Sequence, residues 1–512
     1  MGIGGGTIGY SLAKKGLSVL FIDKGSNYDS LESLKGNYSE CFVDKTYDEK
    51  ERLRLSGRAF DQILEKSEYK YPFIGSGTGG SSALYGMAME RFFPEDFNPR
   101  EVTNNDVSLS NLPVDGWPFS YKDLAPYYTM AEKLYKVRGS NDFLKGNSKN
   151  GLLPPPPIND INKKLYDFLV LKNLNPYILP RASNFKEDCI ECQGFLCPKN
   201  CKIDSFNACI LPAIKNYKAS IMTNSEVMNI SLKGDSVKTI TIKNNNKLIN
   251  LKAEMFILAA GAIHTPYILL KSRNNSFPGG IANSSGQVGK NLMRHLIDLY
   301  IVKTDKKINP IGFMKEIAFN DLYNFENGRL GTVQSFGRPP DISILTDTVF
   351  NKISDYSLIN KKYFKVFKPI VSELINKYFS KKVLFNSILE DLPYLENSIN
   401  IDKNFKSPII NFNLFPYEKK LINNSRRVIK NIFKDIGVKV VKQAEDNKRL
   451  AHVCGTCRAG DNPKVSVLDS NCRSHDIKNL YITDASFFPT SGGTNPALTI
   501  AANALRVSDK II

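Results

Sequence analysis

The fold that we predict is decided by residues 479–506, NLYITDASFFPTSGGTNPALTIAANALR, together with residues 451–460, AHVCGTCRAG. Residues 481–483 have the pattern of a short buried strand that ends at Asp484. Pro496 follows a polar loop and suits the first turn of a helix, where no backbone N–H is needed. In open α/β sheets, ligands bind outside the carboxyl ends of strands and against helix N-termini. We therefore predict a cofactor site here, flanked by the titratable ring of His452 and the amide of Asn495.

The first 25 residues, MGIGGGTIGYSLAKKGLSVLFIDKG, have the pattern of a dinucleotide-binding unit. A glycine loop leads into a predicted helix over residues 7–15, and a predicted strand over residues 19–22 ends at Asp23. In such units the glycines let the backbone approach a pyrophosphate, and the acidic residue binds the ribose hydroxyls. The N-terminal segment therefore predicts a second part of the same cofactor site.

Two registers fit this glycine loop. Gly4, Gly6 and Gly9 match the G-x-G-x-x-G pattern literally. In the other register Gly2 and Gly5 are the second and third glycines, and we favour it because the helix is expected to start directly after the third glycine. The favoured register places the first glycine and the first strand of the unit upstream of Met1.

These segments resemble the glucose–methanol–choline (GMC) family of FAD-dependent oxidoreductases, as do YPFIGSGTGGSSALYGMAMERFFPEDF at residues 71–97 and GAIHTPYILLKS at residues 261–272. The resemblance implies an α/β fold (α+β overall) with a Rossmann-like FAD-binding domain and a substrate domain built on an antiparallel sheet. The FAD-binding domain is predicted to comprise residues 1–120, 205–296 and 446–512. The substrate-binding or cap domain then comprises residues 121–204 and 297–445, which include the period-2 strands 398–401 and 409–414.

The same resemblance assigns the site residues. His452 and Asn495 correspond to the catalytic pair of the family. The residues expected to bind the cofactor are Gly2, Gly4, Gly5, Asp23, Gly79, Gly80, Ser81, Ser82, Val227, Asp484, Ala485 and Pro496. Some members attach FAD through a histidine in the loop that corresponds to residues 71–97, which contains none here, so noncovalent FAD is expected.

The implied reaction oxidises an alcohol or sugar hydroxyl to a carbonyl by hydride transfer to flavin N5. His452 would act as the base or oxyanion partner, and Asn495 would donate a hydrogen bond to the substrate oxygen. Three hypotheses stay open. The protein is a self-contained oxidase or dehydrogenase, the catalytic subunit of a membrane-associated dehydrogenase complex that contains an iron–sulfur cluster, or a flavin-poor truncated remnant.

Five of the nine cysteines lie between residues 189 and 209. Cys189, Cys192, Cys197 and Cys201 are separated by two, four and three residues. Thiolates on so short a loop suit an iron–sulfur cluster or zinc. The spacing resembles that of the cluster-bearing catalytic subunit of bacterial glucose dehydrogenases in the GMC family. Structural thiols or a local disulfide are the third interpretation.

The formal net charge of +18 favours an anionic surface or an acidic partner. No nucleic-acid-binding module is recognisable, so a nucleic-acid partner is not expected. Residues 358–382, LINKKYFKVFKPIVSELINKYFSKK, interleave lysines with apolar residues. They predict either a segment that lies on an anionic membrane or a solvated lysine face over a core. Without a signal peptide or a long apolar run, we predict a cytoplasmic or membrane-peripheral protein that binds a small alcohol or sugar and has a membrane or electron-acceptor partner.

Overall fold

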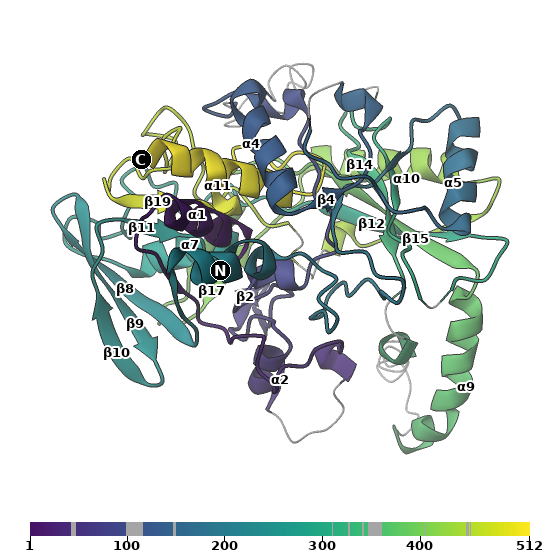
Figure 1. The fold of residues 1–512 in the computed structure, drawn as a ribbon, viewed down its shortest axis with the longest axis horizontal. Helices are drawn as coiled ribbons and strands as arrows, with labels where there is room; N and C mark the ends of the chain where they lie inside the picture. The colour runs from purple at the N-terminus through teal and green to yellow at the C-terminus, as the bar shows by residue number, and fades with distance from the viewer. Residues whose placement is uncertain are drawn as a thin grey trace.

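A computed structural model of the protein describes residues 1–41, 48–98, 116–146, 150–309, 311–325, 328–339, 342–346, 361–404, 406–446, 450 and 452–511. Its elements form two regions side by side (Figure 1). One region, the terminal region, contains both ends of the described chain. The other is built around a six-stranded sheet.

The terminal region contains two parallel strand pairs. β1 (Leu20–Ile22) pairs with β7 (Ser220–Met222), and β11 (Phe256–Leu258) pairs with β19 (Leu480–Ile482). Helix α7 (Gly261–Lys271) follows β11, and helix α11 (Ala497–Ile511) follows the loop after β19. The strand, loop and helix predicted around Asp484 and Pro496 are therefore confirmed. Pro266 lies inside α7 and cannot donate to the Ala262 carbonyl, which accepts a hydrogen bond from Thr456 Oγ1 at 2.7 Å instead.

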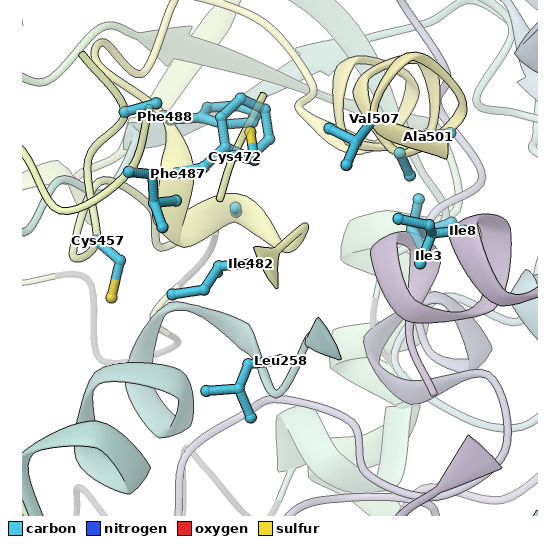
Figure 2. Close-up of a cluster of buried hydrophobic side chains, with 14 of the residues drawn as sticks. Ile3, Ile8, Leu258, Cys457, Cys472, Ile482, Phe487, Phe488, Ala501 and Val507 are labelled. Carbon is cyan, nitrogen blue, oxygen red and sulfur yellow. The ribbon is translucent and has the colours of Figure 1, made fainter. Parts of the chain in front are cut away.

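Helix α1 (Ile3–Lys14) packs against α11, as Figures 1 and 2 show. Ile3 and Ile8 of α1 share a buried cluster with Ala501 and Val507 of α11. At the end of this contact, Lys15 Nζ donates a hydrogen bond to the Ser508 carbonyl at 2.7 Å, across 493 positions of sequence. The two ends of the described chain thus build one core.

The helix predicted over residues 7–15 starts earlier than expected. Gly2 is the N-cap of α1, so Gly4 and Gly5 lie inside the helix. The close approach of α1 to the end of β19 explains a glycine at position 4, because a Cβ there would lie 2.1 Å from the Thr483 carbonyl oxygen. The expectation that the helix starts only after Gly5 was wrong.

The second region confirms the predicted antiparallel sheet. All neighbouring strands in it are antiparallel. In spatial order the strands are β18 (Val438–Val441), β12 (Leu296–Lys303), β15 (Lys382–Leu389), β14 (Thr332–Gly337), β13 (Ile317–Phe319) and β5 (Tyr177–Ile178). Apolar side chains of this sheet form a second core with α5 (Asp160–Leu171) and α10 (Pro416–Ile432).

The strands predicted over residues 398–401 and 409–414 belong to a different sheet. β16 (Ser398–Ile401) and β17 (Pro408–Asn411) form a four-stranded sheet with β2 (Ile63–Glu65) and β3 (Glu68–Lys70). Period-2 alternation predicts a strand but not its partner, because the partner is set by the rest of the chain. The remaining elements are α2 (Glu49–Leu55), α4 (Tyr121–Leu134), α6 (Leu211–Tyr217), β4 (Val137–Arg138), β6 (Arg181–Ala182), β8 (Ser225–Lys233), β9 (Ser236–Asn244) and β10 (Lys247–Leu251).

Helix α9 (Lys361–Phe379) extends from the six-stranded sheet at the edge of the molecule (Figure 1). Phe367, Ile370, Leu374 and Tyr378 on this helix have exposed fractions of 56%, 59%, 61% and 42%. These apolar side chains therefore do not cover a core, and the second interpretation of residues 358–382 is wrong for this stretch. Residues 358–360 lie outside the described residues. None of the helices in the described ranges has the length and apolar character that a membrane span requires.

Candidate active site

A cavity of about 1670 Å³ is lined by residues of both regions. Pockets for a single small molecule usually have volumes of about 300–1,000 Å³. This cavity therefore has room for a dinucleotide and a second, smaller molecule.

One end of the cavity is lined by the residues predicted to bind the cofactor. All of them line it except Gly79. Gly79 has a left-handed φ of 86° at the N-cap of the short 3-10 helix Gly80–Ala83, and a Cβ there would lie 3.1 Å from the Asp204 carboxylate. Gly79 therefore shapes the turn and is not among the residues that line the cavity, and its contact with the cofactor stays a prediction.

The backbone of this end fits a phosphate-bearing ligand. No protein atom lies within 4 Å of the position that a Cβ on Gly2 would occupy, so the N-terminus of α1 is open to the cavity. A Cβ on Gly80 would lie 2.8 Å from the Gly2 Cα, so the glycine loop and the helix meet backbone to backbone. Backbone N–H groups at a helix N-terminus are a preferred site for phosphate. The residues present thus fit the pyrophosphate of FAD.

Asp23 and Asp484 lie at the carboxyl ends of β1 and β19. Asp23 Oδ1 accepts hydrogen bonds from the backbone N–H groups of Gly25 and Gly77 at 2.9 and 2.7 Å, and Oδ2 accepts one from the amino group of Met1. Asp484 accepts four hydrogen bonds, two of them from the first turns of α7 and two from Ser486. Asp484 therefore ties α7 to the loop after β19 and fixes the cavity wall.

His452 lines the same cavity, and its backbone φ of 57° lies in the left-handed region. His452 Nδ1 lies 2.8 Å from His295 Nδ1, and His295 Nε2 lies 2.8 Å from the Gly492 carbonyl and 3.1 Å from the Ser491 carbonyl. Two histidines are thus linked in series to the loop that precedes α11.

These partners assign the protons of both rings. A carbonyl only accepts, so His295 carries its proton on Nε2. Burial lowers the pKa of His295 to about 4, so this ring is neutral and its Nδ1 accepts a hydrogen bond from His452 Nδ1–H. Burial, followed by the neighbouring His295 and Lys315, lowers the pKa of His452 well below its usual range. His452 therefore presents an unprotonated Nε2, which has no hydrogen-bond partner among the described residues.

Asn495 lines the same cavity as His452 and is 6% exposed. Its Oδ1 is buried, and no described residue donates a hydrogen bond to it. The loop that carries Asn495 is fixed by Trp117 Nε1, which donates to Thr490 Oγ1 at 2.8 Å, and by Gly493 N–H, which donates to the Tyr323 hydroxyl at 2.7 Å. A rigid loop thus offers an unpaired amide to a ligand.

The sequence analysis did not find His295. His295 stands in residues 283–296, NSSGQVGKNLMRHL, to which no function was assigned. The available signal was the rarity of this residue, since the chain has only four histidines. The contact with His452 spans 157 positions and could not be inferred from spacing.

The four clustered cysteines do not have the geometry predicted for a metal site. Among the described residues, no group of three or more His, Cys, Asp or Glu side chains is arranged to hold a metal ion. The thiols are free, and two of them accept backbone hydrogen bonds, Cys197 from Cys201 N–H at 3.3 Å and Cys189 from Glu191 N–H at 3.4 Å. The neighbouring Cys192 thiol lowers the pKa of Cys197 to about 4. This arrangement favours structural thiols over an iron–sulfur or zinc site at Cys189, Cys192, Cys197 and Cys201.

The fold and the cavity define the protein as a flavoprotein oxidoreductase. Models of the GMC oxidoreductase family match residues 172–297 and 393–504. The chain belongs to the GMC oxidoreductase family, whose enzymes bind FAD.

Two relatives and one solved structure illustrate the similarity. Paromamine 6'-oxidase of Streptomyces fradiae is 24% identical over 454 residues, which cover 85% of this chain and 78% of the relative. The large subunit of fructose dehydrogenase of Gluconobacter japonicus is 24% identical over 563 residues, which cover 100% of this chain and 96% of the relative. A structure of formate oxidase from Aspergillus oryzae, determined in a study of its FAD modification, shares the fold with a TM-score of 0.66 at 14% identity, over 100% of this chain and 96% of that chain. The protein is an enzyme, a GMC oxidoreductase that acts on the hydroxyl groups of alcohols or sugars.

Proposed function

We propose that the enzyme holds FAD noncovalently and oxidises an alcohol or sugar hydroxyl to a carbonyl, with His452 as the proton acceptor. The observation that carries this proposal is the unprotonated, unpaired Nε2 of His452 in a cavity that also has room for a dinucleotide. When bound, FAD supplies the acceptor for the hydride that leaves the substrate carbon.

His452 removes the hydroxyl proton. A base must be unprotonated when the substrate arrives, and the lowered pKa of His452 keeps Nε2 free at neutral pH. Once Nε2 has taken the proton, the ring is cationic, and Nδ1–H donates more strongly to the neutral His295. His295 thereby orients the base before the reaction and stabilises its charge afterwards.

Asn495 holds the substrate oxygen. Its amide is unpaired in the described structure, so a substrate hydroxyl can take the place of a missing partner without breaking another hydrogen bond. The residues Gly2, Gly4, Gly5, Asp23, Gly80, Ser81, Ser82, Val227, Asp484, Ala485 and Pro496 would form the walls that hold the cofactor.

The test is an anaerobic spectrum of the purified enzyme before and after addition of a panel of alcohols and sugars. Flavin bands that bleach with one compound would support the proposal. The His452→Ala variant is expected to retain FAD and to lose about 100-fold or more of the reduction rate, the usual contribution of a positioned base. A colourless wild-type protein would favour the flavin-poor remnant, and an unchanged rate in the variant would remove His452 from the mechanism.

We also infer that the enzyme associates with an anionic membrane surface. The exposed apolar residues of α9 support this second proposal, together with the charge of +18 and the lysines at positions 368, 377, 381 and 382. The match to a protein named as a large subunit is consistent with a catalytic subunit of a membrane-associated complex. The cysteine geometry gives no support to an iron–sulfur cluster in such a complex.

A further inference from the structure

The six-stranded sheet presents two amides to the cavity. Leu299 of β12 is paired with Asn386 of β15, and Asn386 is paired with Gln334 of β14, so the three residues form one row across three strands. All three line the cavity. Asn386 Oδ1 and Gln334 Oε1 are buried, and no described residue donates a hydrogen bond to either. Buried amides without partners are uncommon, so this row is suited to a ligand with several hydroxyl groups.

Lys315 adds a positive charge to the same cavity. It precedes β13, lines the cavity and is only 5% exposed. Its ammonium stands over Gly86, where a Cβ would lie 2.6 Å from Nζ. Burial lowers the pKa of Lys315 to about 8. A Cβ at residue 86 would therefore displace this ammonium and also the Gln193 side chain, whose Oε1 would lie equally close.

No described carboxylate neutralises Lys315. Two carboxylates, Glu191 and Glu90, interact electrostatically with Lys315, and each forms an ion pair with another cation. Glu191 pairs with Arg181 at 3.2 Å, and Glu90 pairs with Lys145 at 3.2 Å. Glu191 also accepts a hydrogen bond from Lys315 N–H at 2.8 Å, but no described carboxylate forms an ion pair with Lys315 Nζ. The ammonium lies over the Phe336 ring, 6.0 Å from its centroid. A buried cation without an ion-pair partner is unfavourable, and an anionic group of a ligand would compensate it.

The ammonium shares a cavity with the proposed reaction centre, because Lys315 and His452 both line it. The charge of Lys315 is also one cause of the lowered pKa of His452. An anion held by Lys315 would therefore occupy the same cavity as the hydroxyl that His452 deprotonates.

We propose that Lys315, with the Asn386–Gln334 amide row, forms a subsite for a carboxylate carried by the substrate, so that the preferred substrates are polyhydroxy acids rather than neutral alcohols. This inference rests on the proposed function, because it specifies the substrate class of the same site. In the complex, the carboxylate accepts a charge-assisted hydrogen bond from Lys315, and the amides bind the neighbouring hydroxyls.

The test compares two probes with the same six-carbon skeleton, D-gluconate and D-glucitol. Single-turnover reduction of the bound flavin is measured with each, and binding of glutarate, a carboxylate without a hydroxyl, is measured by calorimetry. We expect gluconate to be favoured in wild-type enzyme. The Lys315→Met variant should lose about 10-fold or more in gluconate reduction and in glutarate affinity, the size of one hydrogen bond to a charged group. Its rate with glucitol, which has no carboxylate, should fall by a clearly smaller factor than its rate with gluconate.

A second variant and a control variant separate the loss of the ammonium from a general loss of folding or activity. Gly86→Ala should displace the ammonium and produce the same selective loss, even if Lys315→Met folds poorly. Lys164→Met removes a lysine that is 53% exposed and should change nothing. Equal losses with gluconate and glucitol in Lys315→Met would overturn the proposal and would indicate that Lys315 acts on the reacting oxygen or on the flavin. Unchanged glutarate binding would overturn it as well. Because glutarate is not oxidised, its binding tests the subsite even if no alcohol reduces the flavin, which would count against the proposed function alone.

Discussion

The hydrogen bond between His295 and His452 fixes the proton of the base, and this leads to a pH prediction. His295 accepts from His452 only while its own Nδ1 is unprotonated, which holds above the pKa of about 4 that burial gives this ring. The pKa of His452 is also lowered well below 6.5. We therefore expect single-turnover flavin reduction to keep its rate as the pH falls from 7 to about 5, and to decline only below that. A decline centred near pH 6.5, the ordinary value, would contradict this assignment.

A substitution tests the same contact. His295→Leu removes the acceptor for His452 Nδ1–H and frees the base to rotate and to change tautomer. We expect this variant to retain FAD and to lose about 10- to 100-fold of the flavin reduction rate, the effect typical of residues that orient a reacting ligand. The matched control is His475→Leu, which removes a partly buried imidazole whose ring hydrogen-bonds Ser466 and Gly460 among the described residues. A rate loss of equal size in both variants would indicate a general effect of losing an imidazole ring.

For single residues, the sequence predicted some members of the site and missed others. The motifs placed His452 and Asn495, and the structure brings both to one cavity, although their catalytic roles stay a prediction. Gly79 and Gly80 were both assigned to the cofactor, and only Gly80 lines the cavity, because the motif does not show which of two adjacent glycines faces a ligand. His295 and Lys315 could not be found, since their roles come from contacts made across sheets and loops.

In helix α1, we expect Gly4 to be required for packing and Gly2 to leave room for the cofactor, and two substitutions can test these effects separately. A Cβ at Gly4 would collide with the Thr483 carbonyl, whereas a Cβ at Gly2 would meet no protein atom within 4 Å. We expect Gly4→Ala to destabilise even the FAD-free protein by about 1–3 kcal/mol, as overpacking usually does. Gly2→Ala should leave the FAD-free protein as stable as the wild type and weaken FAD binding. Denaturant unfolding of the FAD-free proteins and FAD titration measure the two effects. Loss of stability in Gly2→Ala with unchanged stability in Gly4→Ala would contradict the packing of α1 described above.

The sequence analysis placed the start of α1 too late because of the same close contact at Gly4. Sequence rules place glycines in loops because a glycine inside a helix is unfavourable by about 1 kcal/mol relative to alanine. Contact with β19 overrides this preference at Gly4, and such contacts are absent from local sequence patterns. By contrast, β19 and α11 were predicted well, because their apolar pattern and Pro496 are local signals.

For the whole molecule, the exposed apolar face of α9 predicts binding to anionic vesicles. A Phe367→Ser, Leu374→Ser double variant should lose about 10-fold or more of its binding to phosphatidylglycerol vesicles, because each apolar side chain that leaves water contributes roughly 1.5–3 kcal/mol. Flavin reduction should be unaffected. Leu171→Ser is the control, since Leu171 is 82% exposed on α5. Sedimentation with vesicles measures the effect, and a wild-type enzyme that stays in the supernatant would contradict the membrane proposal.

At this scale the family and the α/β architecture with an antiparallel sheet were predictable, because several motifs occur in a fixed order along the chain. The domain boundaries stay a prediction. The wall of the cavity on the six-stranded sheet was not predictable. Its row of Leu299, Asn386 and Gln334 depends on the register of three strands far apart in sequence, and a shift by one residue would point all three side chains away.

The packing of α1 against α11 also has a consequence for how the protein is made. Ribosomes add about 5–20 residues per second, so the 493 positions between Lys15 and Ser508 correspond to roughly 25 to 100 s of synthesis. During that time α1 has only elements nearer in sequence, such as α6, to pack against. The contact of Ile3 and Ile8 with Ala501 and Val507 therefore forms late, after the intervening chain has been synthesised. The core that joins α1 to α11 is thus among the last parts of the molecule that a nascent chain can complete.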